Sequence, residues 1–494
     1  MKIKLKGKYV IAYEDNDHIL ISNGEIVYEN DTILYVGKGY SGQVDETIDV
    51  GEAIISPGFI DLDALGDIDH DSIHIEQEEE KRKNLLWSKE YYDSGPKEFM
   101  SKEEEAFKSL YAYSQLILNG VTTAMPITSV FYKRWAETFE EIEAAAHHAG
   151  RLGLRVYLGP SYQAGIRVVS PDGEVSVEFR EDEGWAGLER AVEFIRQFDG
   201  AYNGLVRGML APERIETQTK EILVQTKKYS EELNCPVRLH AAQGEFEYKE
   251  IVSRYKKTPI RYLYDIGFLG MNTAIPHAFY TAEYAGEEEK YDSDMKLLLE
   301  TGTTVIHCPL VLGRHGIAMD SFSEYLRMGI PLALGTDAFP PDFFQNIRTA
   351  AILSRVTSKR VEGSTYADIF RAATIGGANF LGRPDLGRLS PGAKADIIIV
   401  DITGFHIGNI DDPFRSMCLA ASGSDVKMSI INGRIVMKDR KISGIDFEEL
   451  KIKGKKYFNK LKSSYIERDY QKLGPEKLFT PALKKVKEHI ISEK

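Results

Sequence analysis

Cysteine is scarce in this chain, which has only Cys235, Cys308 and Cys418 among 494 residues. The three stand far apart, and no two have the spacing of a metal-binding pair. This excludes a disulfide framework and a cysteine-based zinc module. Three isolated thiols are typical of a reducing compartment, so we expect a cytoplasmic protein.

Long hydrophobic runs and an excess of positive charge are also missing. No apolar stretch reaches the roughly 18 residues that a membrane helix needs. The first ten residues alternate polar and apolar side chains, as a strand does and a signal peptide does not. The formal net charge of −13 argues against the basic stripe of a nucleic-acid-binding protein. We therefore expect a small-molecule substrate, and neither a membrane nor a nucleic acid as partner.

The central part of the chain, residues 57–389, alternates apolar strands with amphipathic helices. Seven or eight such strand–helix units follow one another. A run of this kind predicts a parallel sheet, and at this length the α/β fold called a (β/α)8 TIM barrel. Residues 446–494 are rich in lysine and helical in pattern, which predicts a C-terminal helical extension.

The two flanking segments, residues 1–56 and 390–445, have a different pattern of short strands and turn signals. Asn23–Gly24 and Asn432–Gly433 are each typical of a tight hairpin. No helical period interrupts the first segment. The simplest interpretation is that both segments pair into one small β-sandwich domain beside the barrel.

Three strands of the predicted barrel end in a side chain that can bind a metal ion. They are V-R-L-H with His240, A-I-P-H with His277 and L-G-T-D with Asp337. Barrel strands present their carboxyl ends on one face, so we expect these side chains to meet there. Imidazole nitrogens and carboxylate oxygens are ligands for divalent metals, and a carboxylate can also take the proton of an attacking water.

Together with P-G-F-I-D-L-D-A-L at 57–65 and G-R-L-S-P-G-A-K-A-D-I-I-I-V-D at 387–401, these motifs resemble the amidohydrolase superfamily. The closest branch is that of cytosine deaminase and triazine hydrolase, which is chlorohydrolase-like. The resemblance covers roughly residues 4–438. It implies one divalent metal ion, zinc or iron with manganese as a third option, bound by His240 and Asp337. It also implies that His277 binds metal or stabilises charge, and by analogy a homodimer.

The first strand departs from that family. Its usual ending, P-G-F-x-D-x-H-x-H, supplies two histidine ligands, but Asp63 and Leu65 occupy those places here. Leucine cannot bind metal. The loop that follows, G-D-I-D-H-D, offers carboxylates and His70, so Asp63 and His70 are our candidates for replacement ligands. The alternative is a solvated acidic loop, which would leave the ion weakly held or absent.

Other departures and additions concern the substrate. Gln243 stands where deaminase relatives have a glutamate, and an amide can orient a substrate but cannot take up a proton. His307, Arg314 and His315 follow the seventh strand and are candidates for substrate contact. Trp87 lies in the segment that covers the pocket in the family, where it could stack on a planar ring. Core packing is the alternative for Trp87.

These residues predict a metal-dependent hydrolase acting on non-peptide carbon–nitrogen bonds, with Asp337, His277 and Gln243 as its catalytic residues. The reaction would deaminate or hydrolyse a planar N-heterocycle or a related amidine. One alternative is hydrolysis of a cyclic amide, or of a halide or amine substituent on a ring; ammonia release separates it from deamination. A second alternative is a metal-free barrel that binds a ligand without turnover, for which Leu65 is the main support.

Overall fold

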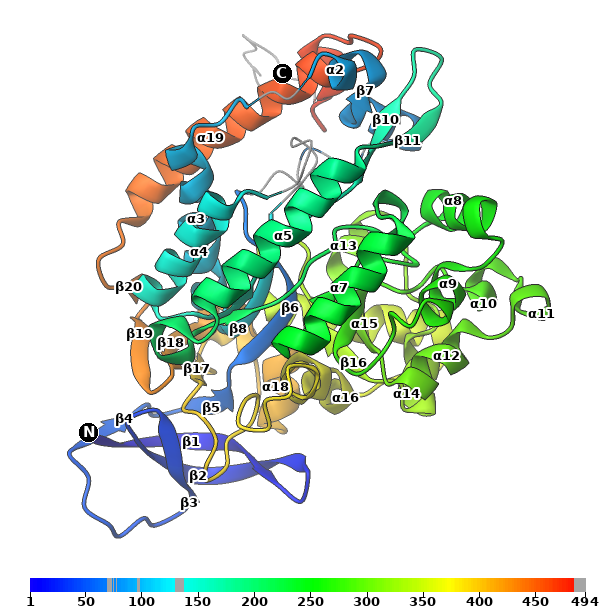
Figure 1. Ribbon diagram of the computed structural model, residues 1–494. Coiled ribbons are helices and arrows are strands. Elements are labelled where there is room, and N and C mark those ends of the chain that lie inside the picture. The colour runs from blue at the N-terminus through cyan, green and yellow to red at the C-terminus, as the bar shows by residue number, and fades with distance from the viewer. Residues whose placement is uncertain (69–72, 74, 77, 96–97, 129–136, 484–494) are drawn as a thin grey trace, which may run out of the picture.

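Parallel strands that follow one another along the chain form the centre of the molecule (Figure 1). The computed structural model describes residues 1–68, 73, 75–76, 78–95, 98–128 and 137–483. One sheet contains, in order, β6 (Phe59–Leu65), β8 (Val121–Ile127), β9 (Arg155–Leu158) and β12 (Val206–Gly208). A second contains β13 (Val237–Arg238), β14 (Thr273–Pro276), β15 (Thr304–His307) and β16 (Leu332–Leu334). The predicted mixed α/β fold is confirmed.

The two parallel sheets meet along both of their edges. On one side Leu210, just past β12, forms a parallel bridge with Val237 at the start of β13. On the other side the backbone N–H of Asp337, past β16, donates to the carbonyl oxygen of Asp63 in β6 at 2.8 Å. The carboxyl ends of the first and last strands are therefore fastened to each other.

The helices between the strands begin and end at residues suited to those places. Ser101 opens α3 (Lys102–Leu118) with a capping box, and the hydroxyls of Thr138 and Thr219 cap α4 (Phe139–Leu152) and α7 (Lys220–Leu233). Gly153 and Asn234 end the last two in the left-handed conformation that terminates helices. The further long helices are α5 (Glu181–Phe198), α8 (Glu245–Tyr255) and α15 (Phe343–Ser358). Shorter ones are α9 (Pro259–Asp265), α12 (Asp294–Thr301), α13 (Pro309–Arg314), α14 (Phe322–Met328), α16 (Tyr366–Arg371), α17 (Gly377–Phe380) and α18 (Pro413–Ala420).

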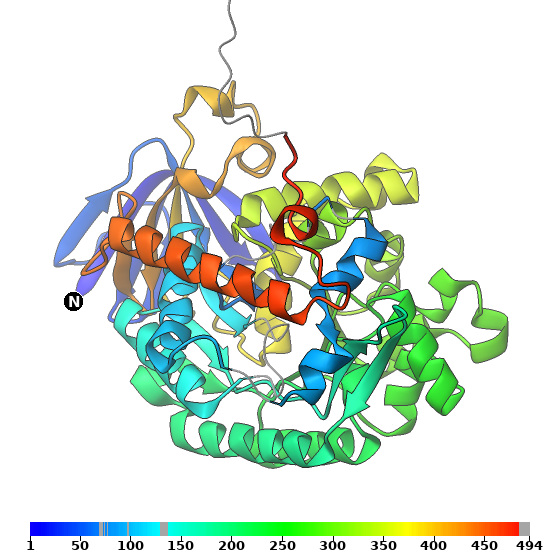
Figure 2. The same cartoon turned by 90° about the horizontal axis from the view of Figure 1, so that it is seen from above.

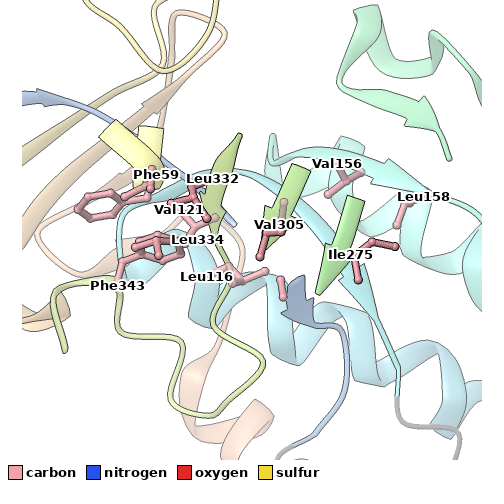
Figure 3. Packing of buried hydrophobic residues seen from close by; sticks show 14 of the residues in the cluster. Phe59, Leu116, Val121, Val156, Leu158, Ile275, Val305, Leu332, Leu334 and Phe343 are labelled. Atoms are coloured by element: carbon pink, nitrogen blue, oxygen red, sulfur yellow. The ribbon is translucent and has the colours of Figure 1, made fainter. Parts of the chain in front are cut away.

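Both faces of these strands are buried, which explains their nearly continuous apolar sequences. Val305 and Leu334 pack in the layer between strands and helices, together with Leu116 of α3 (Figure 3). Their chain neighbours Ile306 and Ala333 belong to a separate apolar cluster on the other face of the strands. Alternation along each strand thus divides the core into two layers.

Strands from the two ends of the chain form one sheet of nine strands. Its members are β1 (Lys2–Glu14), β2 (Asp17–Glu29), β3 (Thr32–Gly37), β4 (Glu46–Asp49), β5 (Ala53–Pro57), β17 (Ile397–Asp401), β18 (Val426–Ile431), β19 (Arg434–Lys438) and β20 (Lys441–Ile442). The two ends are joined by antiparallel pairing of β17 with β5, with Ile397 opposite Pro57.

Of the two expected hairpin turns, the structure contains one. Asn432–Gly433 connects β18 to β19, and both residues have positive φ. The prediction for Asn23–Gly24 is wrong, because that pair lies within β2 and the turn is made at Asp15–Asn16 instead. A Cβ on Gly24 would lie 2.5 Å from Cγ2 of Val10, so close packing between strands, and no turn, requires this glycine.

The C-terminal part of the chain forms α19 (Phe447–Arg468), which lies across the ends of other elements (Figures 1 and 2). Its Leu461 and Tyr465 pack in an apolar cluster with Leu85 and Met100 from the segment between β6 and α3. Lys472 beyond the helix lies 2.7 Å from the carboxylate of Glu90. Within the described ranges, none of the helices has the length and apolarity needed to cross a bilayer.

Candidate metal and active site

Asp63, His240 and His277 form a buried group whose potential ligand atoms all lie within 4.8 Å of one another. Asp63 is in β6, and the two histidines stand just beyond β13 and β14. Nε2 of His240 lies 3.6 Å from Oδ2 of Asp63, and Nε2 of His277 lies 4.0 Å from the same oxygen. Three strand ends that are far apart in sequence therefore converge on one point.

Asp337 borders this group from the last strand. Its Oδ2 lies 3.4 Å from Nε2 of His277, and its side chain retains 21% exposure. Both residues have backbone φ in the left-handed region, 67° for His277 and 38° for Asp337. Such conformations cost about 1–3 kcal/mol each and cluster at functional sites. The bond from the His277 N–H to the Ile306 carbonyl oxygen, 2.8 Å long, helps to hold the strained segment.

The two histidines present a ring nitrogen to the centre of the group. Nδ1 of His240 lies 3.1 Å from the carbonyl oxygen of Glu213, which can only accept, so Nδ1 donates and Nε2 faces the group. His277 is fully buried, and neither of its ring nitrogens has a hydrogen-bond partner among the described residues. Burial lowers the pKa of His277 to about 3, so the ring is neutral at pH 7. A buried, neutral and unpartnered imidazole fits a metal ligand.

Arg238, which sequence reasoning missed, orients the carboxylate of Asp63. Its Nη1 lies 3.3 Å from Oδ1 of Asp63 and donates to the carbonyl oxygen of Leu62 at 3.1 Å. Burial raises the pKa of Asp63, but His240 and Arg238 outweigh that effect and hold the pKa well below its ordinary value. Asp63 is therefore ionised, with Oδ2 directed to the histidines. The signal was an arginine two residues before His240 in an apolar strand, since residues i and i+2 share a face.

Two more buried groups surround Asp63. Asp61 accepts hydrogen bonds from the hydroxyl and the backbone N–H of Thr336, at 2.6 and 3.0 Å, and so ties the first strand to the last. Burial raises the pKa of Asp61 to about 6. The thiol of Cys308 lies 3.6 Å from Oδ2 of Asp63 within the apolar cluster inside the strands.

Gln243 is held by a neighbour that the sequence did not single out. Nη1 of Arg214 donates to Oε1 of Gln243, and Nε of Arg214 lies 3.2 Å from Oε1 of Glu213. The backbone N–H groups of Ala242 and Gln243 both donate to the carboxylate of Glu247, at 2.6 and 2.9 Å. Burial, followed by repulsion from a nearby carboxylate, raises the pKa of Glu247 to about 8. The Gln243 side chain and backbone are thus fixed from two sides.

The other predicted site residues have different surroundings. His307 points toward α14, with its ring 4.6 Å from that of Phe322. Arg314, at the end of α13, donates to the carbonyl oxygen of Phe339 at 2.8 Å, and His315 caps the same helix. None of these three belongs to the group around Asp63 in the described part of the chain.

Trp87 and His70 also remain predictions. Trp87 is buried in β7 (Trp87–Ser88), where it contacts Tyr91 edge-on at 5.0 Å. That position agrees with the core-packing alternative. His70 lies outside the described residues, so its role as a replacement ligand is not addressed by the structure.

Two imidazoles and two carboxylates gathered at the carboxyl ends of parallel strands define a class of protein, the metal-dependent hydrolases built on an α/β scaffold. The chain belongs to the Amidohydrolase family, whose sequence profile matches residues 54–436.

Individual relatives agree with this assignment. The chain is 26% identical over 454 residues to a 5-methylthioadenosine/S-adenosylhomocysteine deaminase of Pyrococcus abyssi, covering 91% of this chain and 97% of the relative. Its fold is similar to that of a zinc-bound adenosine deaminase from Xanthomonas campestris, with a TM-score of 0.72, 18% identity, and coverage of 93% and 98% of the two chains. An atrazine chlorohydrolase from Arthrobacter aurescens, complexed with zinc, has a TM-score of 0.74 at 19% identity and coverage of 92% and 100%.

The comparisons confirm the predicted family and the predicted enzyme class, a hydrolase acting on carbon–nitrogen bonds. Zinc is present in both of these solved structures. At 18–19% identity, the likeness to those structures concerns the fold.

Proposed function

We propose that the protein is a metal-dependent hydrolase of a planar N-heterocycle or related amidine, with its site at the carboxyl ends of the central strands. The observation that carries this proposal is the convergence of Asp63, His240 and His277, with Asp337 beside them. Three costly buried polar groups and two strained backbone positions would have no reason to persist at one point in a decayed site.

We infer that the two parallel sheets close into one (β/α)8 barrel, because they are bonded along both edges. The residues of the site stand at the face where such barrels carry their chemistry. We retain residues 57–389 as the barrel and residues 446–494 as a C-terminal extension. Residues 1–56 and 390–445 would form the composite β domain. A cytoplasmic location and a homodimer remain proposals of the same kind.

Asp63, His240 and His277 would hold the ion, and His70 is retained as a further candidate. One carboxylate and two imidazoles suit zinc, with iron or manganese as the alternatives. A divalent ion bound there supplies Lewis-acid polarisation and activates water at neutral pH.

The chain's own residues would handle protons and orient the substrate. Asp337, partly exposed and next to His277, accepts the proton of the attacking water. The alternative role of the neutral His277, in place of metal binding, is to stabilise charge that develops on the tetrahedral carbon. Gln243 presents its amide nitrogen as a donor, because its oxygen is already engaged by Arg214. Gln243 therefore orients the substrate and transfers no proton.

The relatives named as adenosine-type deaminases favour an exocyclic amine as leaving group. Gln243 in place of a proton-transferring acid favours the alternative, a cyclic amide or a ring substituent that leaves without an acid. Release of ammonia from a panel of aminated and oxo-substituted heterocycles separates the two reactions.

Elemental analysis of the purified protein and of the His240→Ala and His70→Ala variants tests the proposal. We expect about one zinc, iron or manganese ion per chain in the wild type, and loss of the ion in His240→Ala. Loss in His70→Ala as well would assign His70 a ligand role, whereas retention would leave that role to Asp63. A wild type that binds no ion even after zinc or iron is added would refute the hydrolase and favour the metal-free ligand-binding barrel.

A further inference from the structure

Arg214 stands at the mouth of the site with hydrogen-bond donors to spare. It forms a parallel bridge with His240, which places it in the next chain segment around the site. Its side chain keeps 18% exposure, whereas Asp63 and His277 are fully buried. Nη1 and Nε are engaged by Gln243 and Glu213. Among the described residues, Nη2 makes no hydrogen bond to the protein.

Gln243 adds a second donor beside the first. Arg214 can only donate, so the oxygen of the Gln243 amide faces the guanidinium and the NH2 group faces away from it. Glu247 accepts hydrogen bonds from the backbone N–H groups of Ala242 and Gln243, and this fixes the backbone from which the Gln243 side chain extends. The pair therefore offers N–H groups in a fixed arrangement before any ligand arrives.

Glutamine at position 243 also keeps a further negative charge away from Arg214. Glu213 already pairs with Nε of Arg214. A glutamate at position 243 would place a second carboxylate beside the same guanidinium.

We propose that Arg214 and Gln243 together form a carboxylate-binding subsite, so that the substrate is a heterocycle carrying one negatively charged oxygen group. This inference rests on the proposed function, which supplies the heterocyclic ring and its hydrolysis. The negatively charged group is inferred from Arg214 and Gln243. It transfers to Arg214 the substrate contact that the sequence predicted for Arg314, whose guanidinium donates to the Phe339 carbonyl oxygen. Arg214 acts here as a specificity residue.

The test compares binding of nicotinate and nicotinamide, which share a ring and differ in the charge of one group, by calorimetry on zinc-loaded full-length protein. We expect the wild type to prefer nicotinate by about tenfold or more, as a charge-assisted hydrogen bond gives. Arg214→Met should reduce the preference to less than threefold. Gln243→Glu, nearly isosteric, should reduce it as well, because the new carboxylate would pair with Arg214.

Arg196→Met is the matched control. Arg196 lies on α5, away from the site, and its guanidinium lies 3.1 Å from the carboxylate of Glu232. This variant should leave the preference unchanged. Equal binding of both probes to the wild type would overturn the proposal. A preference for nicotinate that persists in both Arg214→Met and Gln243→Glu would also overturn the proposal, because the metal ion itself would then bind the carboxylate. Elemental analysis of the same samples reports on the proposed function separately, since the two donors do not require the ion.

Discussion

At the scale of single residues, the site depends on Asp63, whose two carboxylate oxygens face different partners. Asp63 faces Arg238 with Oδ1 and the two histidines with Oδ2. The arginine offsets the charge of the buried carboxylate, while the second oxygen remains for a cation. A buried pair of this kind is strongly destabilised when only one partner is removed.

Asp63→Asn should therefore lower the free energy of unfolding by about 3–5 kcal/mol and abolish metal binding, because Arg238 would be left buried without its partner. Urea denaturation at pH 7 and elemental analysis measure the two effects. The double variant Asp63→Leu/Arg238→Met should recover much of the stability and none of the metal. Equal destabilisation of the single and double variants would contradict the pairing.

Asp337→Asn tests the proton acceptor. Its side chain lies beside His277 and outside the closest group of ligand atoms, so the variant should keep its metal. Turnover of the heterocycle found by substrate screening should fall by about 100-fold or more, the usual contribution of a general base. Loss of metal and activity together would instead make Asp337 a ligand.

At the scale of elements, the β1–β2 hairpin is fastened through His18 to the helical segment that contains Phe370 and Thr374. Nε2 of His18 lies 3.0 Å from the Thr374 hydroxyl, and its ring packs edge-on against Phe370 of α16 at 5.0 Å. Burial lowers the pKa of His18 to about 4. The folded protein therefore holds a neutral ring where the unfolded chain would take up a proton.

The sign of the pH effect follows from this difference. Stability from His18 is fully present above the ordinary histidine pKa of about 6.5 and is lost as the pH falls toward 4. Between pH 6.5 and 5 the loss should be about 2 kcal/mol. His18→Gln should remove that share of the acid sensitivity, as measured by urea midpoints at pH 7 and pH 5. A variant with the wild-type pH dependence would exclude His18 as its source.

The elements themselves were largely predictable, since they depend on local signals. Ser101 and Thr138 start helices where a side chain can cap the first N–H groups, and Asn432–Gly433 makes its turn alone. The hairpin turn predicted at Asn23–Gly24 was wrong because this dipeptide lies inside β2. Glycine is required at position 24 because the side chain of Val10 leaves no room for a Cβ there.

At the scale of the whole molecule, α19 covers the segment between β6 and α3. The apolar cluster beneath it includes Leu461, Leu85 and Met100, and a charge there would face no polar partner in the cluster. Leu461→Asp should therefore lower the free energy of unfolding by about 3 kcal/mol. Metal content should be unchanged, because α19 carries none of the ligand atoms grouped around Asp63.

Lys455→Asp on the exposed side of the same helix is the control and should have little effect. Thermal unfolding and elemental analysis of both variants measure the difference. If Leu461→Asp lost the ion while remaining folded, α19 would have to shape the site directly.

The sequence by itself determined the strand–helix order, the family, and the strand ends that bear His240, His277 and Asp337, because periodicity, capping and motif spacing are local. Only the tertiary structure decided which partners those side chains meet. Asp61 and Thr336 are 275 residues apart, yet they share two hydrogen bonds. Similarly, Arg214 reaches Gln243 across two strand ends. Such pairings depend on how the strands close around one another, and no local pattern encodes that geometry.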